Sequence, residues 1–155
     1  MSTHIFNMFG HTTAEQAALN CLVDQLKKHE GLKLTPYKCT ANKLTIGVGR
    51  NLEDVGISEE EAEFLLHNDI NRAKNQLLKV FPWVSELDSV RFAALINFTF
   101  NVGIGTVQKF TKAMDFLKNK QYDKASSEFL NSRWAKQVGK RSLEITEQIR
   151  TGEWQ

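Results

Sequence analysis

The spacing of hydrophobic residues predicts two long helices in the first half of the chain. Apolar side chains recur every three to four residues over 13–30 and again over 58–79. Gly31 follows the first stretch and Pro82 follows the second, and both residues are typical of helix ends. Capping boxes, in which threonine or serine precedes glutamate by three positions, are expected to open the two helices at Thr12–Glu15 and Ser58–Glu61.

A β-containing segment separates these two helices. Residues 32–48 hold Pro36 and Gly47, which both oppose a helix, together with β-forming residues. A polar turn at 40–43 interrupts them. The segment is therefore expected to form a hairpin or small sheet.

The rest of the chain is strongly helical. From about Glu86 the residues are apolar nearly all round, which predicts a buried helix that ends at 103–105. Three shorter helices are expected near 107–119, 122–131 and 140–149.

These elements predict an α+β, mostly helical fold with two lobes in a single domain, 1–155. A chain of 155 residues can bury a core without a metal or a disulfide. The small β lobe is expected at 31–56 and a connecting helix at 57–80. The larger helical lobe is expected to take 1–30 and 81–155.

Charge and hydropathy exclude several classes of function. The 20 basic and 18 acidic residues give a net charge of +2, which argues against nucleic-acid binding through a dense basic surface. Modest attraction to an anionic polymer such as a bacterial wall remains open. No apolar run approaches the ~20 residues of a membrane span, and residues 1–16 lack the pattern of a signal peptide.

Cysteine and histidine usage predicts no metal site and no cofactor. Cys21 and Cys39 could form one disulfide, but nothing in their spacing demands it, and separate free thiols in a reducing cytosol are expected. No CxxC or Cys/His cluster is present, and the four histidines are scattered along the chain.

The candidate chemistry lies in 29–51, which reads HEGLKLTPYKCTANKLTIGVGRN. Glu30 ends the first helical pattern and precedes the β segment, where a lone carboxylic acid is a plausible general acid. Taken alone, however, Glu30 is better explained as a solvated charge at a helix end. Thr45 is an ordinary strand residue by its type.

This segment resembles the family 24 glycoside hydrolases, the T4-type phage lysozymes. Three further stretches carry the resemblance, which covers about 24–154: LDSVRFAALINFTFNVGIGTVQKFT at 87–111, SRW at 132–134 and IRTGEW at 149–154. It implies a two-lobe fold with peptidoglycan in the cleft. It also implies a catalytic Glu–Asp–Thr triad, whose positions fall on Glu30, Cys39 and Thr45.

Cys39 departs from the family pattern. Glycosidic cleavage needs an acid for the leaving oxygen and a group that activates water or stabilises the positive sugar. A Cys39 thiolate could act as that base or as a nucleophile. In the alternative interpretation Cys39 is idle and Glu30 works with Thr45, whose hydroxyl would hold the water.

The resemblance also implies supporting residues in the helical lobe. Arg141 matches an arginine close to the catalytic glutamate, so it is expected to pair with Glu30. Phe100 either stacks on a sugar ring or packs in the core. Asn97 is expected to be structural, and Trp134 and Trp154 are expected to be core residues.

The resulting hypothesis is a phage endolysin, a monomeric lysozyme that hydrolyses peptidoglycan between N-acetylmuramic acid and N-acetylglucosamine. It would accumulate in the host cytoplasm, without stable membrane insertion, and reach the wall with the help of a holin. The alternatives are a lytic transglycosylase that uses Glu30 alone and a non-catalytic wall-binding module.

Overall fold

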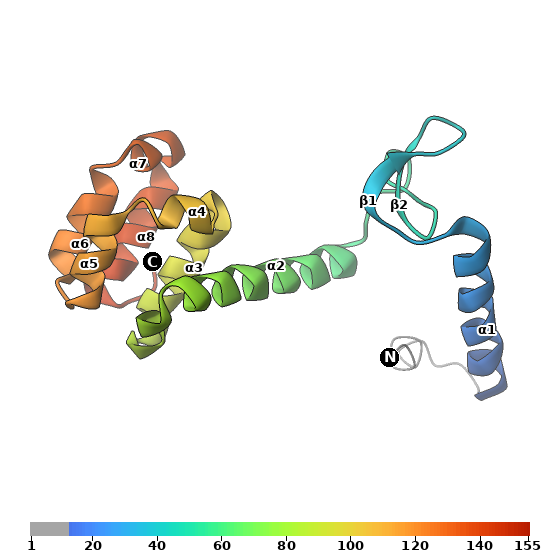
Figure 1. Ribbon diagram of the computed structural model, residues 1–155, viewed down its shortest axis with the longest axis horizontal. Coiled ribbons are helices and arrows are strands. Elements are labelled where there is room, and N and C mark those ends of the chain that lie inside the picture. The colour runs from blue at the N-terminus through green and yellow to red at the C-terminus, as the bar shows by residue number, and fades with distance from the viewer. Residues whose placement is uncertain (1–12) are drawn as a thin grey trace. The chain divides into compact units, whose positions relative to one another are not determined.

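The computed structural model describes residues 13–155, and these fall into two units. The N-terminal unit runs to Glu59 and holds α1 and a small sheet, and the helical unit, 60–155, holds the remaining helices (Figure 1). This mostly helical fold with a three-stranded antiparallel sheet confirms the expected α+β class. The expected cap at Thr12 lies outside the described residues. The assignment of 1–30 to the helical lobe stays a prediction.

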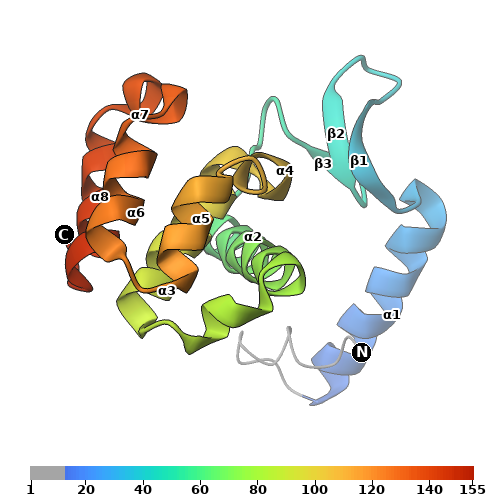
Figure 2. The same ribbon diagram turned by 60° about the vertical axis from the view of Figure 1, so that its left-hand side comes forward.

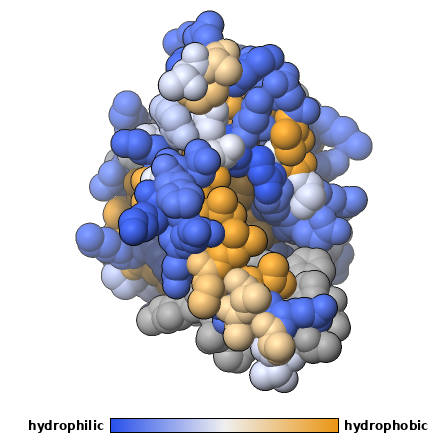
Figure 3. All heavy atoms as spheres, turned by 90° about the vertical axis from the view of Figure 1, so that its right-hand side faces the viewer, coloured by the Kyte–Doolittle hydropathy of each residue, from blue (hydrophilic) through white to orange (hydrophobic). Residues whose placement is uncertain are grey.

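The first helix, α1, spans Thr13–Glu30, as predicted. Gly31 follows it with φ of 74° and donates its backbone N–H to the Lys27 carbonyl at 3.0 Å, which ends the helix. None of the α1 residues is buried. Leu22 and Leu26 remain more than two-fifths exposed. Figure 3, which faces the right-hand side of Figure 1, shows hydrophobic side chains among hydrophilic ones.

The β segment forms a sheet in the order β1-β2-β3, seen side by side in Figure 2. The strands are β1, Lys33–Lys38, β2, Leu44–Gly47, and β3, Arg50–Asn51. The pairing of β1 with β2 confirms the expected hairpin, and β3 adds a strand that the pattern did not reveal. Pro36 lies where the β1–β2 register shifts, on an edge strand that tolerates a missing N–H donor.

The helical unit contains more helices than the sequence pattern predicted. Its elements are α2, Glu59–Val80, the 3-10 helix η2, Pro82–Glu86, α3, Ser89–Val102, α4, Ile104–Val107, α5, Thr111–Lys118, α6, Tyr122–Leu130, α7, Arg133–Val138, and α8, Lys140–Thr151. The long second helix and the three shorter ones are confirmed as α2, α5, α6 and α8. The short helices α4 and α7 were not predicted.

Local capping explains two of these differences. The Asp88 carboxylate accepts the Arg91 backbone N–H at 3.0 Å, so α3 begins at Ser89 rather than near Glu86. The Ser132 hydroxyl accepts the Ala135 backbone N–H at 3.1 Å and starts α7. Both caps are single side chains whose effect a hydrophobic pattern does not register.

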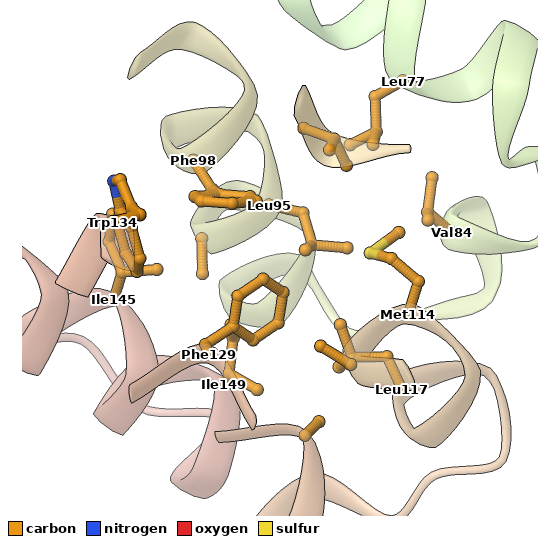
Figure 4. Packing of buried hydrophobic residues seen from close by; sticks show 14 of the residues in the cluster. Leu77, Val84, Leu95, Phe98, Met114, Leu117, Phe129, Trp134, Ile145 and Ile149 are labelled. Carbon is orange, nitrogen blue, oxygen red and sulfur yellow. The ribbon is translucent and has the colours of Figure 1, made fainter. Parts of the chain in front are cut away.

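The core of the helical unit is built around aromatic rings on α3, α6 and α7 (Figure 4). The Phe98 ring centroid lies 5.0 Å from that of Phe129 and 4.7 Å from that of Trp134, both edge-on. Trp134 is therefore a core residue, as expected. Trp154 is 69% exposed, so the expectation that it belongs to the core was wrong.

The expectation that α3 is buried nearly all round was also wrong. Its buried residues are Ala94, Leu95, Phe98 and Thr99, which lie on one face of the helix. Phe100 is 43% exposed. Among the described residues, no helix combines the length and apolarity that a membrane crossing requires.

Candidate active site

Glu30 lies beside the end of the segment TIGVG in the N-terminal unit. It is the last residue of α1, and its side chain packs over Gly49, where a Cβ would lie 3.5 Å from Glu30 Oε2. Gly49 has φ of 76°, a conformation that glycine adopts at little cost. The glycine therefore lets the chain turn after β2 while it stays in contact with the carboxylate.

Cys39 opens the turn that joins β1 to β2. Its backbone N–H donates to the Lys43 carbonyl at 3.0 Å, and its carbonyl accepts the Asn42 N–H at 2.8 Å. Asn42 has φ of 58°, in the left-handed region that asparagine tolerates better than most residues. These bonds fix the backbone of Cys39, whose side chain is a half-buried free thiol.

The turn stabilises the ionised form of the Cys39 side chain. Hydrogen bonding by the Lys43 backbone lowers the pKa of the Cys39 thiol most, followed by the Thr45 hydroxyl and the Ala41 backbone. Partial burial opposes these donors but does not cancel them. The site therefore holds a larger fraction of thiolate near neutral pH than an ordinary cysteine does.

Thr45 occupies the middle of the sheet. On β2 it pairs with Tyr37 of β1 and Asn51 of β3, and it is only 3% exposed. Its hydroxyl donates to the Lys43 carbonyl at 3.0 Å. A hydroxyl carries one proton, so donation to the Cys39 sulfur and donation to this carbonyl are alternatives. Ionisation of the thiol favours donation to the Cys39 sulfur.

Sequence reasoning missed Glu53, which lies in the turn after β3. Its Oε1 accepts the Lys38 ammonium at 2.6 Å and the Leu44 backbone N–H at 2.9 Å. Hydrogen bonding to Lys38 is the main cause that lowers the pKa of the Glu53 carboxyl. The acidic pair 53–54 and the lysines at 38 and 43 were visible in the sequence, but only the strand register brings them together.

Phe100 and Arg141 line a pocket of about 350 Å³ within the helical unit. Arg141 donates from Nε and Nη2 to the Asn97 side-chain oxygen, at 3.2 and 2.6 Å. This contact joins α3 to α8 and agrees with the structural role expected of Asn97. Trp154 also lines the pocket. The expected pairing of Arg141 with Glu30 stays a prediction, as does the stacking of Phe100 on a sugar.

Metal-binding side chains do not gather in the described part of the chain. Residues 13–155 contain no group of three or more histidine, cysteine, aspartate or glutamate side chains that could hold an ion.

Comparison with known sequences decides the family. The sequence model of the phage lysozyme family matches residues 27–151. The chain belongs to this family. The match includes Glu30, Cys39, Thr45, Phe100 and Arg141, and it makes the chain a lysozyme-type hydrolase, as the motifs predicted. It leaves open what each of these residues does.

Individual relatives agree with this family. The chain is 30% identical to probable T4-type lysozyme 2 of Dictyostelium discoideum, over 86% of this chain and 96% of that protein. It is 35% identical to the endolysin of Bacillus phage B103, over 76% of this chain but 45% of that longer protein. It is 33% identical to the endolysin of Acyrthosiphon pisum secondary endosymbiont phage 1, over 76% of this chain and 80% of that protein.

Proposed function

We propose that this lysozyme-family chain is a phage endolysin of glycoside hydrolase family 24. It hydrolyses the β-1,4 bond between N-acetylmuramic acid and N-acetylglucosamine in bacterial peptidoglycan. The family match over residues 27–151 carries the proposal, and the similarity to two phage endolysins supports it. The substrate is an anionic polymer, with which a net charge of +2 is compatible.

Glu30 is the proposed general acid. Cleavage of a glycosidic bond needs a proton on the leaving oxygen, and a carboxylic acid at the edge of a sheet can supply it. The place of the Glu30 side chain beside Gly49 supports this role, because it puts the acid next to the segment that carries Thr45. Arg141 is proposed to pair with Glu30 and orient it, and Phe100 is proposed to contact the sugar.

Cys39 and Thr45 form the proposed water-activating half of the site. A thiolate at Cys39 takes a proton from the attacking water as the anomeric carbon becomes positive. The lowered pKa of the Cys39 thiol supports this, because it raises the thiolate fraction. Thr45 is nearly inaccessible, so its hydroxyl is proposed to position the water through the Cys39 sulfur.

The test is digestion of purified walls, with the products identified. Glu30→Gln is expected to slow release of reducing ends by about 10²–10⁴-fold, the usual contribution of a general acid. Cys39→Asp restores a carboxylate and is expected to stay active, whereas Cys39→Ala loses most activity. Full activity of both Cys39→Ala and Cys39→Ser would exclude a catalytic role for the thiol.

The same digestion separates the rival functions. The absence of a carboxylate at position 39 favours a lytic transglycosylase as the second candidate, because that reaction needs no water-activating group. Products with 1,6-anhydro ends would replace the hydrolase proposal with that one. The other alternative is a non-catalytic wall-binding module. Loss of lysis in Glu30→Gln, with sedimentation on walls unchanged, would exclude it.

The remaining parts of the proposal concern delivery. We propose a monomer that depends on a holin to reach the wall from the host cytoplasm. Expression in a bacterial host with and without a membrane-permeabilising protein tests this step. Lysis of the culture without any such protein would contradict it.

A further inference from the structure

We propose that Glu53 is a positioning residue for this reaction: its carboxylate binds the two residues that directly precede Cys39 and Thr45, and so fixes the thiol relative to the hydroxyl. This inference rests on the proposed function, because it assigns Glu53 to the site formed by Cys39 and Thr45.

The Glu53 carboxylate contacts both strands of the β1–β2 hairpin. One oxygen, Oε1, accepts both the Lys38 ammonium, at 2.6 Å, and the Leu44 backbone N–H, at 2.9 Å. Lys38 and Leu44 are Cα partners at the end of the β1–β2 ladder. Glu53 therefore bridges the pair that closes the 39–43 turn. Cys39 directly follows Lys38 in the sequence, and Thr45 directly follows Leu44.

The side chain of Asn51 fixes the turn that carries Glu53. The Asn51 side-chain oxygen accepts the backbone N–H groups of Glu53, at 3.0 Å, and of Asp54, at 3.1 Å. Asn51 is in turn the β3 partner of Thr45. The turn that presents Glu53 is thus anchored directly opposite Thr45, so the carboxylate and the hydroxyl share one rigid frame.

The contacts of Glu53 affect the geometry of the site more than the stability of the fold. The Glu53 side chain is 37% exposed and that of Lys38 is 55% exposed, and an ion pair this open adds little to folding. The bond to the Leu44 N–H is different, because it sets where β2 begins. A displacement of about 1 Å in a reacting group can cost roughly 10²-fold in rate.

Glu53→Ala and Glu53→Gln form the matched pair that tests this role. Both variants remove the negative charge, and so both free the ammonium groups of Lys38 and Lys43 from it. Only glutamine keeps an oxygen that can accept the Leu44 N–H. Asp54→Asn is the second control, since it removes the charge that pairs with Lys43 at 2.9 Å but keeps an oxygen that can accept the Asn51 side-chain N–H, which donates to Asp54 at 2.8 Å.

The experiment uses the full chain with Cys21→Ser, which leaves Cys39 as the only thiol. Iodoacetamide labelling across pH reports the ionisation of Cys39, and release of reducing ends from soluble peptidoglycan gives kcat and KM. Glu53→Ala is expected to lower kcat at least about tenfold, with KM little changed, as expected for a misplaced reacting group. Its labelling midpoint should lie at higher pH than that of Glu53→Gln.

Two results would overturn the proposal. One is equal kcat and equal labelling midpoints in Glu53→Ala and Glu53→Gln. The other is an equal loss in Asp54→Asn, which would assign the effect to the surface charge of the turn. Labelling does not depend on lysis. If the wild type leaves walls intact, the proposed function fails, whereas the hold of Glu53 on the turn is still decided by the labelling midpoints.

Discussion

At the residue scale, the ionisation of Cys39 depends on a few donors in one turn. Thr45→Val removes the hydroxyl but leaves the Lys43 backbone, the largest cause of the lowered pKa of Cys39. The pKa of the thiol is therefore expected to rise part of the way to its ordinary value of about 8.5. Iodoacetamide labelling against pH, in a chain with Cys21→Ser, measures the change.

Thr45→Ser is the control for that substitution, because it keeps the hydroxyl and removes a methyl group. Its labelling midpoint should stay close to that of the wild type. The sign of the effect on stability follows from linkage. A thiol whose pKa is lowered by folding stabilises the fold above its unfolded pKa, and this contribution is lost as pH falls through the folded value. Equal midpoints in all three proteins would contradict the role of the Thr45 hydroxyl.

Gly49 gives a second prediction at this scale. Gly49→Ala places a side chain at φ of 76° and beside the Glu30 carboxylate. The left-handed conformation alone is expected to lower the free energy of unfolding by about 1 kcal/mol. The new methyl group would lie at ordinary van der Waals distance from Glu30 and would narrow the range of positions open to its carboxylate, so wall digestion should fall further than this loss of stability explains. Thermal unfolding and the digestion rate are the measurements.

Gly56→Ala separates strain from contact. Gly56 has φ of 67°, but a Cβ there would meet no atom within 4 Å. The two variants should lose similar stability, and only Gly49→Ala should lose activity. If Gly56→Ala digests walls as slowly as Gly49→Ala, the apposition of Glu30 and Gly49 has no bearing on catalysis.

The sequence identified some residues of the site and not others for a physical reason. Glu30, Cys39 and Thr45 lie in one short motif whose spacing is visible without coordinates. The proposed role of Glu53 depends on the register of three strands, and β3 has only two residues, Arg50–Asn51. Two residues carry no alternation, so no pattern could show that the turn after them returns to Lys38 and Leu44.

At the scale of elements, Arg91 joins the start of α3 to the end of α8. Its guanidinium donates to the Ile149 carbonyl at 2.7 Å and to the Arg150 carbonyl at 2.9 Å, near the end of α8. It also pairs with Asp88 at 2.7 Å and lies 3.6 Å from the centre of the Tyr122 ring. One side chain thus satisfies two helix-end carbonyls and stacks on a third helix.

Arg91→Ala is therefore expected to destabilise the protein by about 1.5–3 kcal/mol, the range for a hydrogen bond that involves a charged group. Arg91→Lys should recover little of this, because an ammonium cannot reproduce the planar fork. Urea unfolding measures both. Arg72→Ala is the control, since Arg72 pairs with Asp69 only three residues away and is 69% exposed. Equal losses for Arg91→Ala and Arg72→Ala would contradict the joining role.

Helices were predictable where the hydrophobic repeat runs over many residues and a glycine or proline marks the end of the helix. Gly31 and Pro82 fixed the ends of α1 and α2 in this way. The short helices α4 and α7 have four and six residues, too few for a repeat of hydrophobic positions to appear. The helix α4 begins after Gly103, and α7 begins at the Ser132 hydroxyl. Glycine and serine are equally common in turns, so neither residue indicates a helix by itself.

At the scale of the whole molecule, the two units differ in how they are stabilised. All the buried hydrophobic residues of the described chain lie between Ala73 and Ile149, in the helical unit. The buried residue of the N-terminal unit is Thr45, and that sheet is held largely by hydrogen bonds and surface ion pairs. Apolar burial is the dominant favourable term in folding, so most of the stability is expected in 60–155.

This difference predicts that the fragment 60–155 folds by itself and that the fragment 1–59 does not. The helical fragment retains the packed rings of Phe98, Phe129 and Trp134 and the Arg91 contacts, so it should unfold cooperatively and keep its far-ultraviolet helical signal. Between residues 13 and 59, the part of this fragment that the structure describes, there is no buried apolar cluster to offset the chain entropy. Calorimetry of both fragments is the test, with Trp134→Ala in the helical fragment as a control that should abolish its transition. A cooperative transition in 1–59 would show that the sheet and α1 carry a stability of their own.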